Sequence, residues 1–264
     1  MTFDPAPAAA ALLAARKARV PAGPLPAEIV PHDIAEGVAV QFALAGLVGA
    51  VPPAGFKIGA TTTRMQDYLG VTHPAAGFMQ RGNLHDSGAT LNWSDYRGIG
   101  VECELAVRLG HELPFGPCDI NRATAAVGEL FAASEIVENR YGKPPAGDVA
   151  LVGTPTLVAD QFYHAAAVLG TPPADWKKID LQAVPGRILV NGVERSNGRG
   201  ADLLGHPMQA LAWLAASEVA RAFGGLRTGQ VIMLGSVTPP IWLDGPCFVS
   251  VAFDGLPEVR LQFS

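Results

Sequence analysis

The stretch Gly100-Val-Glu-Cys-Glu-Leu-Ala-Val-Arg108 alternates between two kinds of side chain and predicts a β-strand near the middle of the chain. Glu102 and Glu104 leave the same face of this strand, because successive side chains point to opposite faces. Their positions are then roughly 6.6 Å apart, so both carboxylates lie within reach of one small ion. Two such carboxylates repel each other unless a proton or a cation lies between them. An edge strand with a solvated acidic face would explain the same residues, so this stretch alone leaves both interpretations open.

A second segment, Ala133-Ser-Glu-Ile-Val-Glu-Asn-Arg140, is predicted to be a strand and supplies a third carboxylate. Glu135 and Val137 share one face of it, whereas Ile136 and Glu138 share the other. Apolar neighbours favour Glu135 as the partner of the two acids on the first strand. Three carboxylates, water and a bidentate substrate would together supply the roughly six oxygen ligands that Mg²⁺ or Mn²⁺ prefers. The spacing suggests a divalent-metal site and does not decide it.

A single lysine interrupts a short apolar run, Phe56-Lys-Ile-Gly-Ala-Thr61. A charged side chain in such a strand is costly unless it is paired. Lys57 is therefore either a surface residue that extends its ammonium to solvent or a functional ammonium held against an anion. Gly55 and Gly59 permit close backbone approach and favour the functional interpretation. His32 precedes a predicted helix and is a candidate base, although a histidine at such a position is more often structural.

Apolar periodicity predicts helices and strands in separate parts of the chain. The predicted helices cover residues 6–18, 33–47, 61–69, 121–131, 158–169 and 207–222. The further predicted strands cover residues 187–192, 193–196, 231–234, 247–253 and 258–263, with an Asn-Gly hairpin turn between the first two. Residues 72–91 are predicted to be loop. Residues 141–155 are predicted to be a mobile Gly/Pro-rich loop, and the sequence leaves open whether it closes as a lid.

These elements predict an α+β chain that forms one integrated unit. Its N-terminal helical portion covers residues 1–50, and its catalytic β-rich domain covers residues 51–264. The content of 16% charged and 49% hydrophobic residues excludes a disordered chain. It favours an oligomeric protein with a large share of its surface buried.

The charge and the cysteines exclude several classes of partner. The net charge is −5 and no basic block is present, which argues against a nucleic-acid partner. The three cysteines are too few and too scattered for a disulfide framework or a zinc site. No run approaches the roughly 20 apolar residues that span a bilayer, and the N-terminal charges are in the wrong order for a secretion signal. We therefore predict a soluble cytoplasmic protein with no membrane partner.

The acidic strands and the lysine-bearing run occur, with other short segments, in the order and spacing of a known family. The chain resembles the fumarylacetoacetate hydrolase superfamily and, within it, the branch of 2-keto-4-pentenoate hydratases and 4-oxalocrotonate decarboxylases. The resemblance covers nearly the whole chain. Each segment alone is weak evidence, and the order and spacing of all the segments together indicate the family. The main segments are Gly55-Phe-Lys-Ile-Gly59, Leu69-Gly-Val71, Glu102-Cys-Glu104, Glu135-Ile-Val137, Gly205-His-Pro207 and Leu234-Gly-Ser236.

The resemblance implies a mixed β-sandwich or β-roll core, a homo-oligomer, and Mg²⁺ or Mn²⁺ held by Glu102, Glu104 and Glu135. It also implies that Lys57 lies beside a small 2-oxo or 2-hydroxydienoic acid substrate, in a reaction of aromatic compound degradation. The predicted activity is that of a lyase. It is a metal-dependent hydratase that converts a 2-hydroxy-2,4-dienoate into a 4-hydroxy-2-oxo acid.

The chain departs from this branch at Asp160-Gln-Phe-Tyr163, where the branch usually has Asp-Asn-Ala-Ser. We predict that Asp160 and Ser236 bind the substrate. Tyr163 could replace the missing serine hydroxyl as a proton donor, or it could be a packing aromatic. Lys57 suits an acid/base role beside the cation, and electrostatic steering of the substrate carboxylate is the milder alternative.

Two other activities and one non-catalytic role fit the same family. Decarboxylation of a 4-oxalocrotonate-like diacid would need a further cation, for which Arg64, Arg81 or Arg140 are candidates. Hydrolytic C–C cleavage of an acylpyruvate would need a base such as His32. A catalytically silent partner subunit is the alternative of a different class, and the retained carboxylates argue against it.

Overall fold

The two longest strands, β5 (Ile99–Leu109) and β6 (Val127–Glu138), form an antiparallel pair in the larger of two sheets. The structure is a computed structural model, and it describes residues 3–142 and 149–264. The register of the β5–β6 pair places Glu102 directly opposite Glu135. The alternation in β5 thus separates two faces of a buried sheet. Val101, Cys103 and Leu105 pack in the main hydrophobic core, and the two acids leave the other face.

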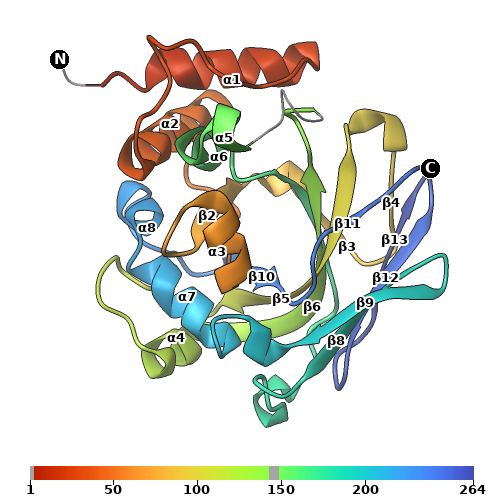
Figure 1. Ribbon diagram of the computed structural model, residues 1–264. Coiled ribbons are helices and arrows are strands. Elements are labelled where there is room, and N and C mark those ends of the chain that lie inside the picture. Colours follow the sequence, from red (N-terminus) through yellow and green to blue (C-terminus); the bar gives the residue numbers. More distant parts are fainter. Residues whose placement is uncertain (1–2, 143–148) are drawn as a thin grey trace.

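The larger sheet is mixed and curls into a roll, with the strand order β2-β1-β10-β5-β6-β7-β3 (Figure 1). β10 pairs in parallel with β1 and antiparallel with β5, and β11 pairs with β5. The other strands of this sheet are β1 (Gly55–Gly59), β2 (Ala75–Met79), β3 (Leu84–Asp86), β7 (His164–Leu169), β10 (Val231–Ser236) and β11 (Ile241–Trp242). This arrangement confirms the predicted α+β fold with a curled β core.

The smaller sheet has the strand order β4-β13-β12-β8-β9 and lies beside the roll, near the C-terminus (Figure 1). β8 and β9 form the hairpin predicted from the Asn-Gly turn, since Asn191 and Gly192 both have positive φ there. The strands are β4 (Ala89–Leu91), β8 (Pro185–Val190), β9 (Val193–Arg199), β12 (Phe248–Phe253) and β13 (Val259–Phe263).

The helices cover the roll on the sides away from the smaller sheet (Figure 1). α1 packs on α2, and α2 packs on α6, so the N-terminal helices are joined to the segment that precedes β7. Asp33 caps α2, because its Oδ1 accepts the Glu36 N–H at 2.8 Å. The helices are α1 (Ala6–Ala18), α2 (Ile34–Leu47), α3 (Thr63–Leu69), α4 (Ile120–Ala126), α5 (Val149–Val152), α6 (Thr154–Ala159), α7 (Pro207–Ala215) and α8 (Glu218–Ala222).

Four predictions about local structure were wrong. The helix expected over 121–131 ends at Ala126, because pairing with β5 makes the next residues strand. The helix expected over 158–169 is the end of α6, a turn and β7. The loop expected over 72–91 contains β2, β3 and β4, whose apolar runs are too short to identify. The helix expected over 207–222 breaks into α7 and α8, where the Ser217 hydroxyl caps the second.

Three further points concern the predicted division of the chain, the predicted loop over 141–155 and the expected absence of a membrane span. The division into residues 1–50 and 51–264 stays a prediction. A fifth prediction about local structure was wrong in part, because the predicted loop over 141–155 contains α5 and the start of α6. Residues 143–148 of that loop lie outside the described residues, and whether the loop closes as a lid stays untested. Within the described ranges, no helix is both long and apolar enough to cross a membrane.

The turn between α6 and β7 has an unusual backbone. Gln161, Phe162 and Tyr163 have φ angles of 62°, 52° and 67°, a left-handed conformation that is uncommon for residues other than glycine. We call these three residues the 161–163 turn. Gly77 on β2 makes room for it, because a Cβ atom there would lie 2.7 Å from the Gln161 carbonyl oxygen.

We predict that Gly77→Ala destabilises the protein by about 1–3 kcal/mol, since the added methyl group would have to displace the backbone of the turn. Gly46→Ala is the matched control, because Gly46 lies at an exposed position of α2 with no neighbouring atom within 4 Å. It should raise the free energy of unfolding by about 0.5–1 kcal/mol through helix propensity. Urea denaturation measures both changes, and equal stabilities of the two variants would contradict this role of Gly77.

Candidate metal centre

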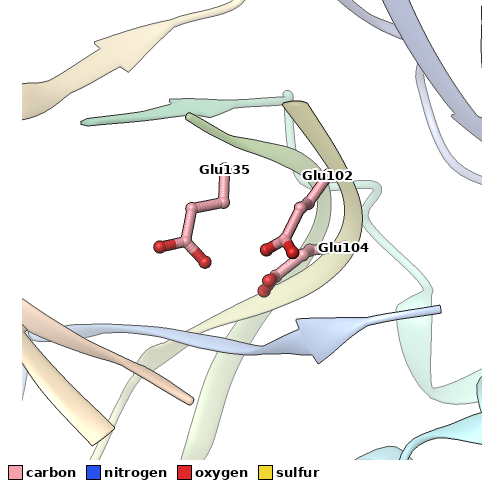
Figure 2. Close-up of side chains that lie close together, drawn as sticks. All are labelled: Glu102, Glu104 and Glu135. Atoms are coloured by element: carbon pink, nitrogen blue, oxygen red, sulfur yellow. The ribbon is translucent and has the colours of Figure 1, made fainter. Parts of the chain in front are cut away.

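Strands β5 and β6 bring three carboxylates together on the concave side of the curled sheet. Figure 2 shows Glu102, Glu104 and Glu135 pointing toward one another. One oxygen from each of the three side chains lies within 4.8 Å of the other two. Since Glu102 is paired with Glu135 and lies two residues before Glu104, the strand register alone explains why the three acids meet. The structure thus brings together the three acids that the sequence analysis singled out, and their role as metal ligands stays a prediction.

The environment of these acids fits a divalent cation. Glu104 and Glu135 are fully buried, whereas Glu102 is partly exposed. Within the described chain, Glu104 Oε1 and Glu135 Oε2 have no hydrogen-bond partner. The Gly235 N–H donates to the other oxygen of Glu104 at 3.0 Å. Unpartnered buried carboxylate oxygens are costly, and an all-oxygen donor set matches hard ions such as Mg²⁺ or Mn²⁺.

Burial and mutual repulsion change the ionisation of the three acids. Burial, followed by the charge of Glu135, raises the pKa of Glu102 to about 8. Burial and the two neighbouring acids hold the pKa of Glu104 well above its ordinary value. Burial acts in the same sense on Glu135, but the charge of Lys57 and the hydrogen bond from His164 outweigh it and lower the pKa of Glu135 to about 2.

Two side chains from other strands of the same sheet contact Glu135: Lys57 from β1 and His164 from β7, the neighbour of β6. The Lys57 ammonium lies 3.4 Å from Glu135 Oε1, and only 2% of Lys57 is exposed. The predicted surface alternative for this lysine is therefore wrong, and the structure places its ammonium against an anion. Its predicted catalytic role stays a prediction. His164 Nδ1 lies 2.9 Å from the same Glu135 oxygen, which identifies the Nδ1–H as the donor.

His164 was not predicted from the sequence as a member of the site. It was assigned to a helix, where its side-chain direction could not be related to Glu135. In the structure it begins β7 opposite Val137, and its side chain therefore shares the face of Glu135. A strand prediction for residues 164–169 would have been needed to find it.

Asp160 lies at the centre of a buried ionic network. Arg140 Nε donates to Oδ2 at 2.8 Å, Arg16 Nε donates to Oδ1 at 2.7 Å, and the Tyr141 hydroxyl donates to Oδ2 at 2.9 Å. Burial opposes ionisation, but Arg140 and Arg16 outweigh it and lower the pKa of Asp160. Both oxygens thus have protein partners, and the predicted contact of Asp160 with substrate stays a prediction. Arg16, from α1, was not anticipated.

The remaining candidate residues, Ser236, Tyr163 and His32, lie in three different environments. Ser236 ends β10 opposite Glu104, and its hydroxyl donates to the Cys103 carbonyl at 3.3 Å. Tyr163 is half-buried, with its ring centroid 5.7 Å from that of Tyr141. Their predicted roles stay predictions. His32 lies on the surface, where its ring pairs with Glu36 at 3.0 Å.

Comparisons with known proteins agree with this geometry. The model of the family described as fumarylacetoacetate (FAA) hydrolase C-terminal matches residues 59–264. A 2-keto-4-pentenoate hydratase of Burkholderia vietnamiensis is 30% identical over 210 residues, which cover 80% of this chain and 78% of the relative. A 4-oxalocrotonate decarboxylase of Pseudomonas putida is 26% identical over 209 residues, which cover 79% of this chain and 76% of the relative.

A solved structure extends the likeness of fold to the N-terminal helices. The 4-oxalocrotonate decarboxylase from Pseudomonas putida G7, complexed with magnesium and adipate, superimposes with a TM-score of 0.88 at 22% identity. The superposition covers 98% of this chain and 97% of that chain. The resemblance inferred from sequence motifs is confirmed.

We predict that the affinity for Mg²⁺ rises with pH between pH 6 and about pH 8. Glu102 and Glu104 have raised pKa values, so they are protonated in the metal-free protein at low pH, and an ion must displace these protons. Each displaced proton should weaken binding about tenfold per pH unit below the pKa of its carboxyl group.

Isothermal titration calorimetry at pH 6 and pH 8, in buffers of different ionisation enthalpy, measures both affinity and proton release. Glu135 contributes little to the pH dependence, because its lowered pKa keeps it ionised throughout. Equal affinities at the two pH values, with no proton released, would show that the acids are already ionised without metal.

Proposed function

The chain belongs to the fumarylacetoacetate hydrolase family, and we propose that it is a divalent-metal-dependent hydratase of a 2-hydroxy-2,4-dienoate of the 2-keto-4-pentenoate type. The observation that carries this proposal is the buried cluster of Glu102, Glu104 and Glu135 with Lys57 beside it. The relative named 2-keto-4-pentenoate hydratase supports the substrate class and the reaction. The enzyme is then a hydro-lyase that gives a 4-hydroxy-2-oxo acid.

Glu102, Glu104 and Glu135 would hold the ion, and their two unpartnered oxygens are available for it. When bound, the ion supplies a Lewis acid for the carboxylate and the 2-oxygen of the substrate. The proposed ion is Mg²⁺ or Mn²⁺, because the donor set consists of carboxylate oxygens. The magnesium in the related decarboxylase structure supports a divalent ion of this kind.

The residues around Glu135 serve orientation and proton transfer. The hydrogen bond from His164 fixes the Glu135 carboxylate, and the contact with Lys57 holds the ammonium beside the cluster. Lys57 would move the proton that the terminal carbon of the dienoate receives, and water then adds at C4 of the resulting conjugated ketone. Tyr163, whose ring contacts that of Phe162, is a second candidate proton donor. A cytoplasmic location and a homo-oligomer remain part of the proposal.

Decarboxylation of a 4-oxalocrotonate-like diacid is the second candidate, favoured by the relatives of that name. Such a substrate needs a cation for its second carboxylate. Arg140, one of the three candidates, is bound to Asp160 and to backbone carbonyls, while Arg64 and Arg81 are exposed. The surface position of His32 gives no support to the hydrolase alternative, and the three retained acids argue against a silent subunit.

We predict that the protein with Mg²⁺ removes the ultraviolet absorbance of 2-hydroxypenta-2,4-dienoate, and that EDTA stops this loss. Glu102→Gln should lower activity at least about 100-fold, because it removes a ligand charge from the ion. Glu129→Gln is the matched control on β6, since Glu129 pairs with Arg108 at the surface. No loss of absorbance with metal bound stoichiometrically would refute this substrate.

We predict that Lys57→Met keeps the metal affinity but loses about 10²–10⁴-fold in kcat, as expected for removal of an acid/base group. Calorimetry gives the affinity, and the same absorbance assay gives the rate. Full activity of Lys57→Met would remove this residue from the mechanism. An increase in KM at unchanged kcat would support the steering alternative instead.

A further inference from the structure

The 161–163 turn places an aromatic side chain beside Lys57. The Phe162 ring centroid lies 4.9 Å from Lys57 Nζ. A Cβ atom on Gly59 would lie 2.7 Å from this ring, so the glycine on β1 is required for its position. Phe162 itself is 6% exposed, so its ring is packed in the main hydrophobic core beside Lys57 and does not extend to solvent.

The turn is held through its first residue, Gln161, and through Asp160, the residue before it. Asp160, just before it, is bound by two arginines and a tyrosine hydroxyl. The Gln161 side chain accepts from Arg16 Nη1 at 2.6 Å and donates to the Phe78 carbonyl at 2.5 Å. Left-handed residues persist only where the surroundings fix them, and these contacts do so. Phe162 is therefore held rigidly beside Lys57.

Two tyrosine rings follow Phe162 in a series of edge-to-face contacts. Phe162 and Tyr163 meet edge to face with ring centroids 5.9 Å apart, and Tyr163 meets Tyr141 in the same way at 5.7 Å. Lys57 lies between Phe162 on one side and Glu135 on the other. A substrate that is bound at the carboxylate cluster and extends past Lys57 would thus meet an apolar surface.

The three cations that contact the 161–163 turn or the residues flanking it are committed to other partners, whereas Lys17, Arg19 and Arg97 also line the neighbouring cavity. Lys57 pairs with Glu135. Arg16 and Arg140 line a cavity of about 460 Å³ beneath α1, but both guanidinium groups bind Asp160 and its backbone carbonyl. A second carboxylate that lies against the Phe162 ring would therefore lose its hydration there without gaining an ion pair from Lys57, Arg16 or Arg140.

We propose that Phe162 is a specificity-determining residue that selects 2-oxo and 2-hydroxydienoic acids with an apolar distal end and rejects those with a distal carboxylate. The proposal rests on the proposed function only in that the substrate is a 2-oxo-type acid bound at the carboxylate cluster. It goes beyond that function by assigning the discrimination between monoacid and diacid substrates to one side chain of this chain.

Binding of two stable ligands of equal length tests the proposal without turnover. 2-Oxohexanoate and 2-oxohexanedioate differ only in a distal methyl group against a distal carboxylate. Calorimetry in saturating Mg²⁺ should show that the wild-type protein binds the monoacid at least about tenfold more tightly, since burial of an unpaired charge is disfavoured.

Substitution of the ring should change this ratio. Phe162→Ala should reduce the preference to less than about threefold, because water can then solvate the distal carboxylate. Phe162→Leu should keep most of the preference, since the side chain beside Lys57 stays apolar. Phe248→Ala is the matched control, because this exposed ring lies on β12 of the smaller sheet and should leave the ratio unchanged.

Equal or tighter binding of the diacid by the wild-type protein would overturn the proposal, and so would an unchanged ratio in a folded Phe162→Ala variant. If circular dichroism shows that Phe162→Ala is unfolded, the wild-type ratio and Phe162→Leu still decide. A preserved monoacid preference in a protein that does not hydrate the dienoate would refute the hydratase proposal alone. Failure of both ligands to bind would refute both proposals.

Discussion

The rest of the site depends on the repulsion between three carboxylates that two paired strands force together. Glu102, Glu104 and Glu135 meet in a low-dielectric interior, where like charges are costly. The chain offsets only part of this cost, through Lys57 and His164 at one oxygen of Glu135. Two other oxygens stay unpartnered within the described residues, and a divalent cation satisfies both requirements at once.

The fold makes this arrangement rigid. The β5–β6 pairing fixes the three acids without any loop, so their geometry does not depend on flexible segments. β1 contributes Lys57. Because Gly59 and Gly77 lack a Cβ atom, the 161–163 turn can approach the sheet closely. The turn then places the Phe162 ring beside Lys57. A strained segment is held here by the Asp160 network, which joins α1 to the roll.

Short-range periodicity predicted the core of the site, whereas the features that depend on long-range pairing were missed. Period-two alternation was sufficient to place Glu102 and Glu104 on one face, and apolar neighbours identified Glu135 and Lys57. The conformation of the 161–163 turn had no sequence signal, since its residues are neither glycine nor asparagine. Without that turn, His164 could not be related to Glu135, and the N-terminal helix α1 could not be related to the Asp160 network.

The central claim is that the three glutamates bind one divalent ion, and a crystal grown with Mn²⁺ tests it most directly. Anomalous scattering locates the manganese independently of the protein coordinates. We expect one peak about 2.1 Å from an oxygen of each of Glu102, Glu104 and Glu135. The absence of a peak at these oxygens in a crystal grown in saturating Mn²⁺ would contradict the account.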